Sequence, residues 1–177
     1  MDASMNTKTK NMISGLFVLL LLATVSEAQA AERKLSFAVS GVVASVKVGS
    51  GEIVKAGTVL AVLDQTTFLA RKRSADANAD ATKLILDLAE VKARQVRELF
   101  DALSTSQEEV DKVETALANA RSGYEAARSR AKIAKWRLQR STLNAPFSGT
   151  VSSVAGYPGM VVNTYAGVQT VVIINAR

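Results

Sequence analysis

The sequence SGTVSSV, from Ser148 to Val154, repeats SGVVASV, from Ser40 to Val46. With the offset between Ser40 and Ser148 held constant, Gly41 matches Gly149, Val43 matches Val151, Ser45 matches Ser153, Val46 matches Val154, Gly51 matches Gly159 and Val54 matches Val162. Chance similarity between two strands rich in valine and glycine is the alternative. Because all the matches share one register, they favour an internal repeat. Such a repeat decides the fold and is therefore considered before any other feature.

Both copies lie in segments that alternate short apolar runs with glycine, residues 34–65 and 144–177. This texture predicts short strands joined by tight turns. Each copy alone has too little apolar surface to be stable, so we expect the two copies to face each other and close a small β-sandwich. Structural turns are predicted at Gly41, Gly51, Gly57, Pro146, Gly149 and Gly159, because glycine supplies positive φ and proline ends the preceding element.

The segment between the copies, residues 67–143, predicts two long helices. Apolar or small residues recur there at alternating spacings of three and four, which is a heptad seam. The first seam comprises Ala75, Ala79, Thr82, Leu86, Ala89, Ala93, Val96 and Phe100, and the second comprises Val110, Val113, Leu117, Ala120, Tyr124, Ala127, Ala131, Ala134 and Leu138. Ser106 followed by Glu109 is a capping box that starts a new helix. We expect an antiparallel hairpin with helices of about 36 residues, roughly 54 Å long.

Charge is distributed unevenly along this hairpin. Its base carries Arg71, Lys72, Arg73, Arg128, Arg130, Lys132, Lys135, Arg137 and Arg140, whereas its tip carries Asp101, Glu108, Glu109, Asp111 and Glu114. This pattern suits the dipole of the second helix at both of its ends. The two readings are a solvated coil with favourable dipole interactions, or a hairpin whose two ends meet different partners.

Composition argues against catalysis. The chain contains no cysteine and no histidine, so it lacks thiol nucleophiles, disulfides, the usual zinc ligands and the common general base. Neither a phosphate-binding glycine loop nor a nucleophile elbow is present. We therefore expect no enzyme activity, no cofactor and no metal. The net charge of +6 would suggest nucleic acid in a cytosolic protein, but the exported protein predicted next has no such partner.

The N-terminal segment, residues 1–30, has the features of a secretory signal. Lys8 and Lys10 precede an apolar run from Gly15 to Val25, and the small-x-small pattern AQA follows at residues 28–30. The run is shorter than the roughly 20 residues that span a bilayer, although an uncleaved anchor is the alternative. We predict export to the periplasm and association with the inner membrane.

The two repeats around a helical hairpin resemble the periplasmic adaptors, or membrane fusion proteins, of the HlyD and RND-efflux type. The matching phrases are SGVVASVKVGSGEIVKAGTVLAVLD and LNAPFSGTVSSVAGYPGMVV, which are similar to the two halves of that family's lipoyl domain. The resemblance implies an α+β fold, a split lipoyl-like sandwich (barrel-sandwich hybrid) with an inserted hairpin. The expected parts are a signal peptide at 1–30, half-domains at 31–66 and 144–177, and the hairpin at 67–143.

The resemblance also implies a function, that of a subunit bridging an inner-membrane transporter and an outer-membrane channel. In that family the sandwich domains form a homo-oligomeric ring, and the hairpin tips meet the channel. The efflux branch has an arginine at the tip, then leucine four residues on and serine seven further. Leu99 and Ser106 match, Gln95 stands at the arginine position, and Arg94 and Arg97 lie close by. We therefore predict tip contacts by Gln95, Arg97, Leu99 and Ser106, although the seam and the cap also explain Leu99 and Ser106.

Two other functions compete with the adaptor role. A lipoyl fold can carry biotin or lipoate, but the hairpin here replaces the turn that presents the modified lysine. An exported coiled-coil scaffold that moves nothing is the main alternative. The outer domains of the family are absent, so we expect a minimal adaptor, one half of a split adaptor or a truncated remnant.

Overall fold

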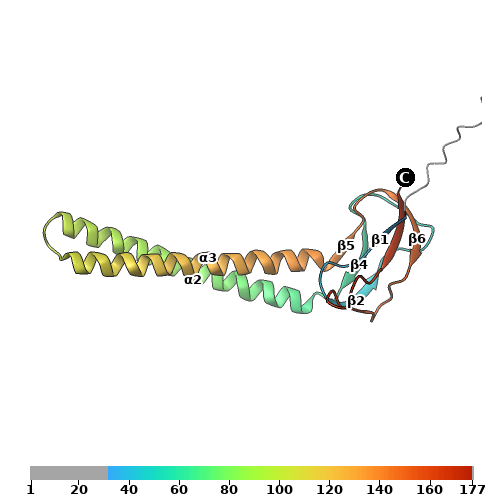
Figure 1. Ribbon diagram of the computed structural model, residues 1–177, viewed down its shortest axis with the longest axis horizontal. Coiled ribbons are helices and arrows are strands. Elements are labelled where there is room, and N and C mark those ends of the chain that lie inside the picture. The colour runs from blue at the N-terminus through green and yellow to red at the C-terminus, as the bar shows by residue number, and fades with distance from the viewer. Residues whose placement is uncertain (1–31, 177) are drawn as a thin grey trace, which may run out of the picture. The chain divides into compact units, whose positions relative to one another are not determined.

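The computed structural model describes residues 32–176, which form eight strands and two helices (Figure 1). The strands are β1 (Glu32–Leu35), β2 (Gly41–Val46), β3 (Ile53–Val54), β4 (Val59–Leu63), β5 (Thr142–Asn144), β6 (Gly149–Val154), β7 (Val161–Val162) and β8 (Val172–Ala176). The helices are α2 (Thr66–Asp101) and α3 (Gln107–Arg140). The predicted signal at 1–30 lies outside the described residues.

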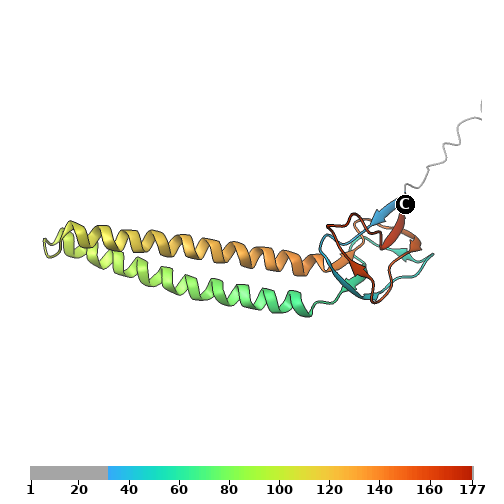
Figure 2. The same ribbon diagram turned by 60° about the horizontal axis from the view of Figure 1, so that its bottom comes forward.

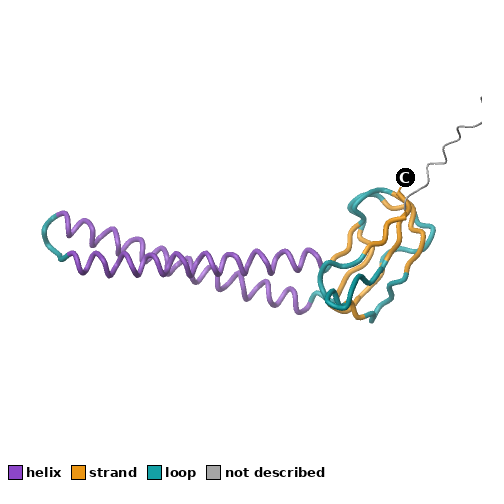
Figure 3. Tube along the Cα trace, in the orientation of Figure 1, coloured by secondary structure: helices purple, strands orange, loops and turns teal. Residues whose placement is uncertain are grey.

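The strands form two antiparallel four-stranded sheets, in the orders β1-β8-β6-β3 and β5-β4-β2-β7. Each sheet takes two strands from each repeat, so the halves interlock instead of forming one sheet each. Figure 3 shows the strands gathered at one end of the hairpin. The core between the sheets is built from alternating apolar residues, among them Val43, Leu60, Leu63, Val151 and Ile174, all of which are buried.

The repeat predicted from the sequence governs the hydrogen bonding. Gly41 pairs with Val162 between β2 and β7, and its counterpart Gly149 pairs with Val54 between β6 and β3. Outside the strands, Gly51 N donates to Val151 O at 2.8 Å, and its counterpart in the second copy, Gly159 N, donates to Val43 O at 2.8 Å. Equivalent residues of the two halves therefore exchange equivalent bonds, and the predicted split sandwich is confirmed.

The turn predictions hold at some glycines and fail at others. Gly51, Gly57 and Gly159 have φ values of 85°, 88° and 89°, so they lie in the left-handed region that favours glycine. Gly41 and Gly149 instead open strands β2 and β6, so the prediction of turns there is wrong.

Close backbone packing explains the glycine at Gly149. A Cβ there would lie 2.2 Å from the carbonyl oxygen of Asn175 on the neighbouring strand β8. Pro146 lies in a bend between β5 and β6, after the end of the preceding strand.

The hairpin is joined to the sandwich by a polar junction. Leu63 N donates to Ser141 O at 2.8 Å, and Gln65 Nε2 donates to Ser141 Oγ and Thr142 Oγ1, each at 3.0 Å. Ser141 is fully buried, and its hydroxyl donates to the carbonyl of Leu138 at 2.6 Å. Helix α3 therefore ends at Arg140, and Leu143, which was predicted to lie in the helical segment, belongs to β5.

The predicted seam holds α2 and α3 together in antiparallel fashion. Leu86, Ala93, Val96, Val113 and Leu117 form a buried cluster between the helices, toward the tip. Arg97 pairs with Glu114, and Arg121 pairs with Glu90 at 3.7 Å, which fixes the height of one helix against the other. Phe100 departs from the predicted seam because it is 38% exposed.

Candidate functional site

The tip of the hairpin is a short turn between Asp101 and Gln107 that ends α2 and starts α3. Leu103 N donates to Phe100 O at 2.9 Å, and Ser104 N donates to Leu99 O at 2.8 Å. These two bonds form a Schellman motif, in which the residue after the helix cap adopts a left-handed conformation. Leu103 occupies that position with a φ of 56°.

The tip exposes apolar side chains. Leu103 is 94% exposed and packs against almost nothing within the hairpin, and Leu99 leaves 49% of its surface exposed. Sequence reasoning selected Leu99 but missed Leu103. The seam pattern cannot reveal Leu103, because the residue lies beyond the last helical turn. The signal available in the sequence was an apolar residue in an otherwise polar loop.

The other predicted tip residues divide between contact and structure. Ser106 is the N-cap of α3, and its hydroxyl accepts a hydrogen bond from Glu109 N at 3.3 Å. Arg97 faces α3 and pairs with Glu114. Gln95 is exposed and lies one helical turn below Leu99 on the same face of α2. The structure therefore brings Gln95 and Leu99 together and places Arg97 on the opposite side of the helix.

A second apolar feature continues below these residues, on the face of α2 that points away from α3. We call it the α2 outer stripe and define it by Leu84, Leu88 and Val91, which are 71%, 72% and 40% exposed. Their spacing of four and three places them on one helical face, in line with Gln95 and Leu99. An apolar face this exposed on a charged helix indicates an interaction surface.

Two ionisable groups on or beside α2, Asp64 and Lys83, have displaced pKa values, and both lie away from the tip. The backbone N–H and the side chain of Thr66 hydrogen-bond the Asp64 carboxylate and lower its pKa. The hydrogen bond to Asp87 raises the pKa of Lys83. Both are ordinary hydrogen bonds at the surface of the hairpin.

Across residues 32–176, neither α2 nor α3 contains a stretch apolar enough and long enough to cross a bilayer. Within the same residues, no group of three or more acidic side chains is arranged to hold a metal ion.

No protein-family model matches the chain. Its fold, however, matches solved structures. A MacA-MexA chimera containing the Pseudomonas aeruginosa MexA α-hairpin domain matches 82% of the chain with a TM-score of 0.60 and 24% identity. The chain has the fold of the membrane fusion proteins. A membrane fusion protein from Streptococcus pneumoniae matches 82% of the chain with a TM-score of 0.63 and 22% identity. The periplasmic adaptor protein EmrA matches 82% of it with a TM-score of 0.52 and 19% identity.

These matches concern part of each larger protein. The chain covers 46% of the chimera, 59% of the pneumococcal protein and 72% of EmrA. The shared part is the sandwich with its inserted hairpin, which is the architecture that the sequence predicted.

Proposed function

We propose that the chain is a periplasmic adaptor subunit of a tripartite efflux or secretion system, which connects an inner-membrane transporter to an outer-membrane channel. The observation that carries this proposal is a paired helical hairpin, built on a split lipoyl-like sandwich, that exposes Leu99 and Leu103 at its tip. The exposed apolar surface of these two side chains is available to a partner. The subunit acts by assembly and catalyses no reaction.

The proposal includes export by the segment 1–30, with Lys8, Lys10 and the apolar run from Gly15 to Val25 as the signal. The domain bounds belong to it as well: the two half-domains lie on either side of the hairpin, which runs from Thr66 to Arg140. The tip contacts are Leu99, Leu103 and Gln95, with Arg97 and Ser106 shaping the turn behind them.

The α2 outer stripe supports assembly into a homo-oligomeric ring. The face of α3 that points away from α2 carries small exposed residues, Ala118, Ser122 and Ala126. The ion pairs between the helices set these residues at about the heights of Val91, Leu88 and Leu84.

If neighbouring copies stand in the same orientation, the stripe of one copy meets the small-residue face of the next at matching heights. Large side chains then pack onto small ones. This contact joins two different surfaces, and such a heterologous contact closes into a ring when the rotation between copies allows it.

The tip proposal is tested by photocrosslinking in the cell envelope. A photoreactive amino acid at position 103 is expected to crosslink to an outer-membrane channel protein, and the same group at position 132, near the hairpin base, is not. Crosslinks from position 103 that reach only inner-membrane proteins contradict the proposal. Crosslinks to an envelope protein with no transport role favour the alternative, an exported coiled-coil scaffold.

The ring proposal is tested by analytical ultracentrifugation. Leu88→Asp places a charge in the stripe and is expected to shift the chain toward the monomer. Asn78→Asp adds the same charge to an exposed position of α2 outside the stripe, and is expected to leave the oligomer unchanged. Equal effects of the two variants, or none from Leu88→Asp, contradict lateral packing through this face.

A further inference from the structure

The hairpin opens near its base. Ala93 and Ala127, seam residues in the closed part, are 0% and 1% exposed. Seam alanines nearer the sandwich, such as Ala75 and Ala134, are only half-buried. Figure 2 shows α2 and α3 diverging toward the sandwich.

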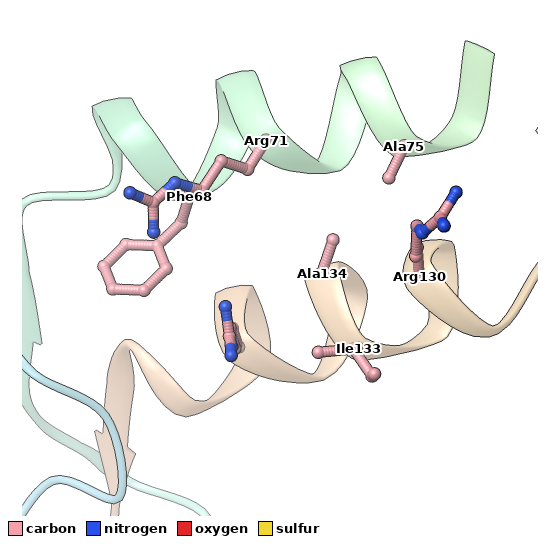
Figure 4. A pocket seen from close by; sticks show the side chains of 7 residues that line it. Phe68, Arg71, Ala75, Arg130, Ile133 and Ala134 are labelled. Carbon is pink, nitrogen blue, oxygen red and sulfur yellow. The ribbon is translucent and has the colours of Figure 1, made fainter. Parts of the chain in front are cut away.

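This separation leaves a cavity of about 240 Å³ between the two helices. Figure 4 shows Ala75 and Ala134 pointing toward each other across the gap, with Phe68 at one end and Arg130 at the other. The apolar part of the lining is completed by Ile133, and Arg71 and Arg137 supply the remaining side chains. The cavity therefore has an apolar body and a cationic edge.

Only some arginines of the hairpin have a carboxylate partner: Arg97, Arg121 and Arg128 each pair with a glutamate. Across residues 32–176, no carboxylate lies within ion-pair distance of the three cavity arginines. Three like charges around one cavity repel one another, and an anion placed among them would offset that repulsion.

The lining also determines which ligand chemistry fits. Its polar side chains are guanidinium groups, which donate hydrogen bonds and accept none. A bound ligand must therefore supply the acceptors, and a carboxylate or sulfonate matches the planar fork of an arginine. A metal cation would be repelled. An ion without an apolar part would leave the surfaces of Ala75, Ile133 and Ala134 uncovered.

We propose that this cavity binds a small amphiphilic anion, an apolar group that carries one carboxylate or sulfonate. Small-molecule sites usually measure about 300–1,000 Å³, so a cavity of about 240 Å³ holds a ligand with one short chain or one ring system. The apolar part lies between Ala75 and Ala134, and the acid group lies at Arg130, at the end of the cavity opposite Phe68. Binding of this ligand depends neither on the ring nor on the tip contacts proposed above, so either proposal can fail while the other stands.

The chain contains its own reporter for this site. A second hollow shares Phe68, Arg71 and Arg137 with the cavity and is also lined by Trp136. Trp136 is the single tryptophan of the chain and is 45% exposed, with Arg140 stacked 6.0 Å from its ring. Its fluorescence therefore reports on ligands that enter the base of the hairpin.

The test is a titration of the full chain with octanoate, followed by Trp136 emission, with octan-1-ol as the neutral probe. Octanoate is expected to bind at least about tenfold more tightly than octan-1-ol, because only the acid accepts the charged hydrogen bonds. Added sodium chloride is expected to weaken octanoate binding by screening the arginines. Equal affinities of the two probes would overturn the proposal.

Variants locate the site. Arg130→Gln is expected to weaken octanoate binding about tenfold, and Arg73→Gln, an exposed arginine outside the cavity, to leave it unchanged. Ala134→Leu fills the cavity and is expected to abolish octanoate binding. Ala77→Leu, on the exposed face of α2, is expected to leave octanoate binding unchanged. Circular dichroism of Ala134→Leu checks the hairpin, and Ala75→Leu repeats the test from the facing helix.

The outcomes separate a cavity from a charged surface. Octanoate binding that survives both cavity-filling variants would overturn the proposal. The proposal would also be overturned if the chain bound vesicles containing phosphatidylglycerol but did not bind octanoate. The positively charged base of the hairpin would then be a membrane-binding surface instead of a ligand site.

Discussion

Replacing Leu103 with glycine is expected to stabilise the hairpin while weakening its tip contact. Leu103 has a φ of 56° at the position of the Schellman motif where glycine is most common. A residue with a Cβ pays about 1–2 kcal/mol in this left-handed conformation. The side chain recovers none of this cost, because it is 94% exposed. The leucine therefore costs stability without any gain within the chain.

The expected size follows from two opposing effects. Glycine relieves the strain of about 1–2 kcal/mol, but it also gives the unfolded chain more freedom, which costs about 0.4–1 kcal/mol. The net increase in the free energy of unfolding is about 0.5–1 kcal/mol. Urea unfolding followed by far-ultraviolet circular dichroism measures it, and the melting temperature is expected to rise by about 1–4 °C.

Leu103→Ala is the matched control, because alanine keeps the Cβ and its strain but removes the apolar side chain. The stability of Leu103→Gly is expected to exceed that of both Leu103→Ala and the unchanged chain. Both variants are expected to lose binding to the channel partner in a pull-down. A glycine variant no more stable than the alanine variant would refute the strain. Retained binding by both would refute the contact.

Three further predictions concern the seam, the sandwich and the start of α2. Leu117→Asp puts a carboxylate into the buried cluster and is expected to lower the free energy of unfolding by about 3 kcal/mol. Ile85→Asp, at a position that is 59% exposed and outside the α2 outer stripe, is expected to change it by less than about 0.5 kcal/mol, and similar urea midpoints for the two variants would count against the seam. Gly149→Ala is expected to lower the free energy of unfolding by at least about 2 kcal/mol, because its Cβ would lie 2.2 Å from a carbonyl oxygen. Gly123→Ala, whose Cβ would have no atom within 4 Å, is expected to raise it by about 1 kcal/mol, and melting temperatures that move in the same direction would contradict this. Because the pKa of Asp64 is lowered in the folded chain, its stabilising contribution is complete above the carboxyl's ordinary pKa of 3.8 and is lost as pH falls through the lower folded value. Asp64→Asn is therefore expected to reduce the fall in melting temperature at acid pH, and an unchanged pH profile would contradict this role of Asp64.

The repeat and the hairpin could be predicted because each has a strict spacing. The constant offset between matching glycines and valines reappears as equivalent pairing in both halves, including the irregularities at Val43–Ser45 and Val151–Ser153. The interlocking of the halves could not be predicted. A strand's alternation shows which side chains face the core, but not whether the strand's neighbour comes from its own half or the other. The same limit explains Gly149, where glycine serves a close approach between strands.

The tip shows a different limit. The heptad spacing predicted the seam and, from the break in the seam, the loop. The capping box correctly predicted Ser106 at the start of α3. The spacing of the efflux branch selected Leu99 by analogy. Leu103 escaped both methods because its backbone conformation depends on how α2 ends, and a sequence with leucine instead of glycine gives no local sign of a left-handed residue.

The uneven seam explains how one hairpin can have both a closed tip and an open base. Toward the tip, Leu86 and Leu117 bury apolar surface between the helices, so that their packing holds the helices together. At the base, alanines bury little, and the helices are held instead by the bonds from Gln65 to Ser141 and Thr142 and by the bond from Leu63 N to Ser141 O. Because that polar junction fixes the base, α2 and α3 need not touch there. The cost of leaving the cavity between Ala75 and Ala134 open is then small, and a ligand can fill it without displacing any packing contact.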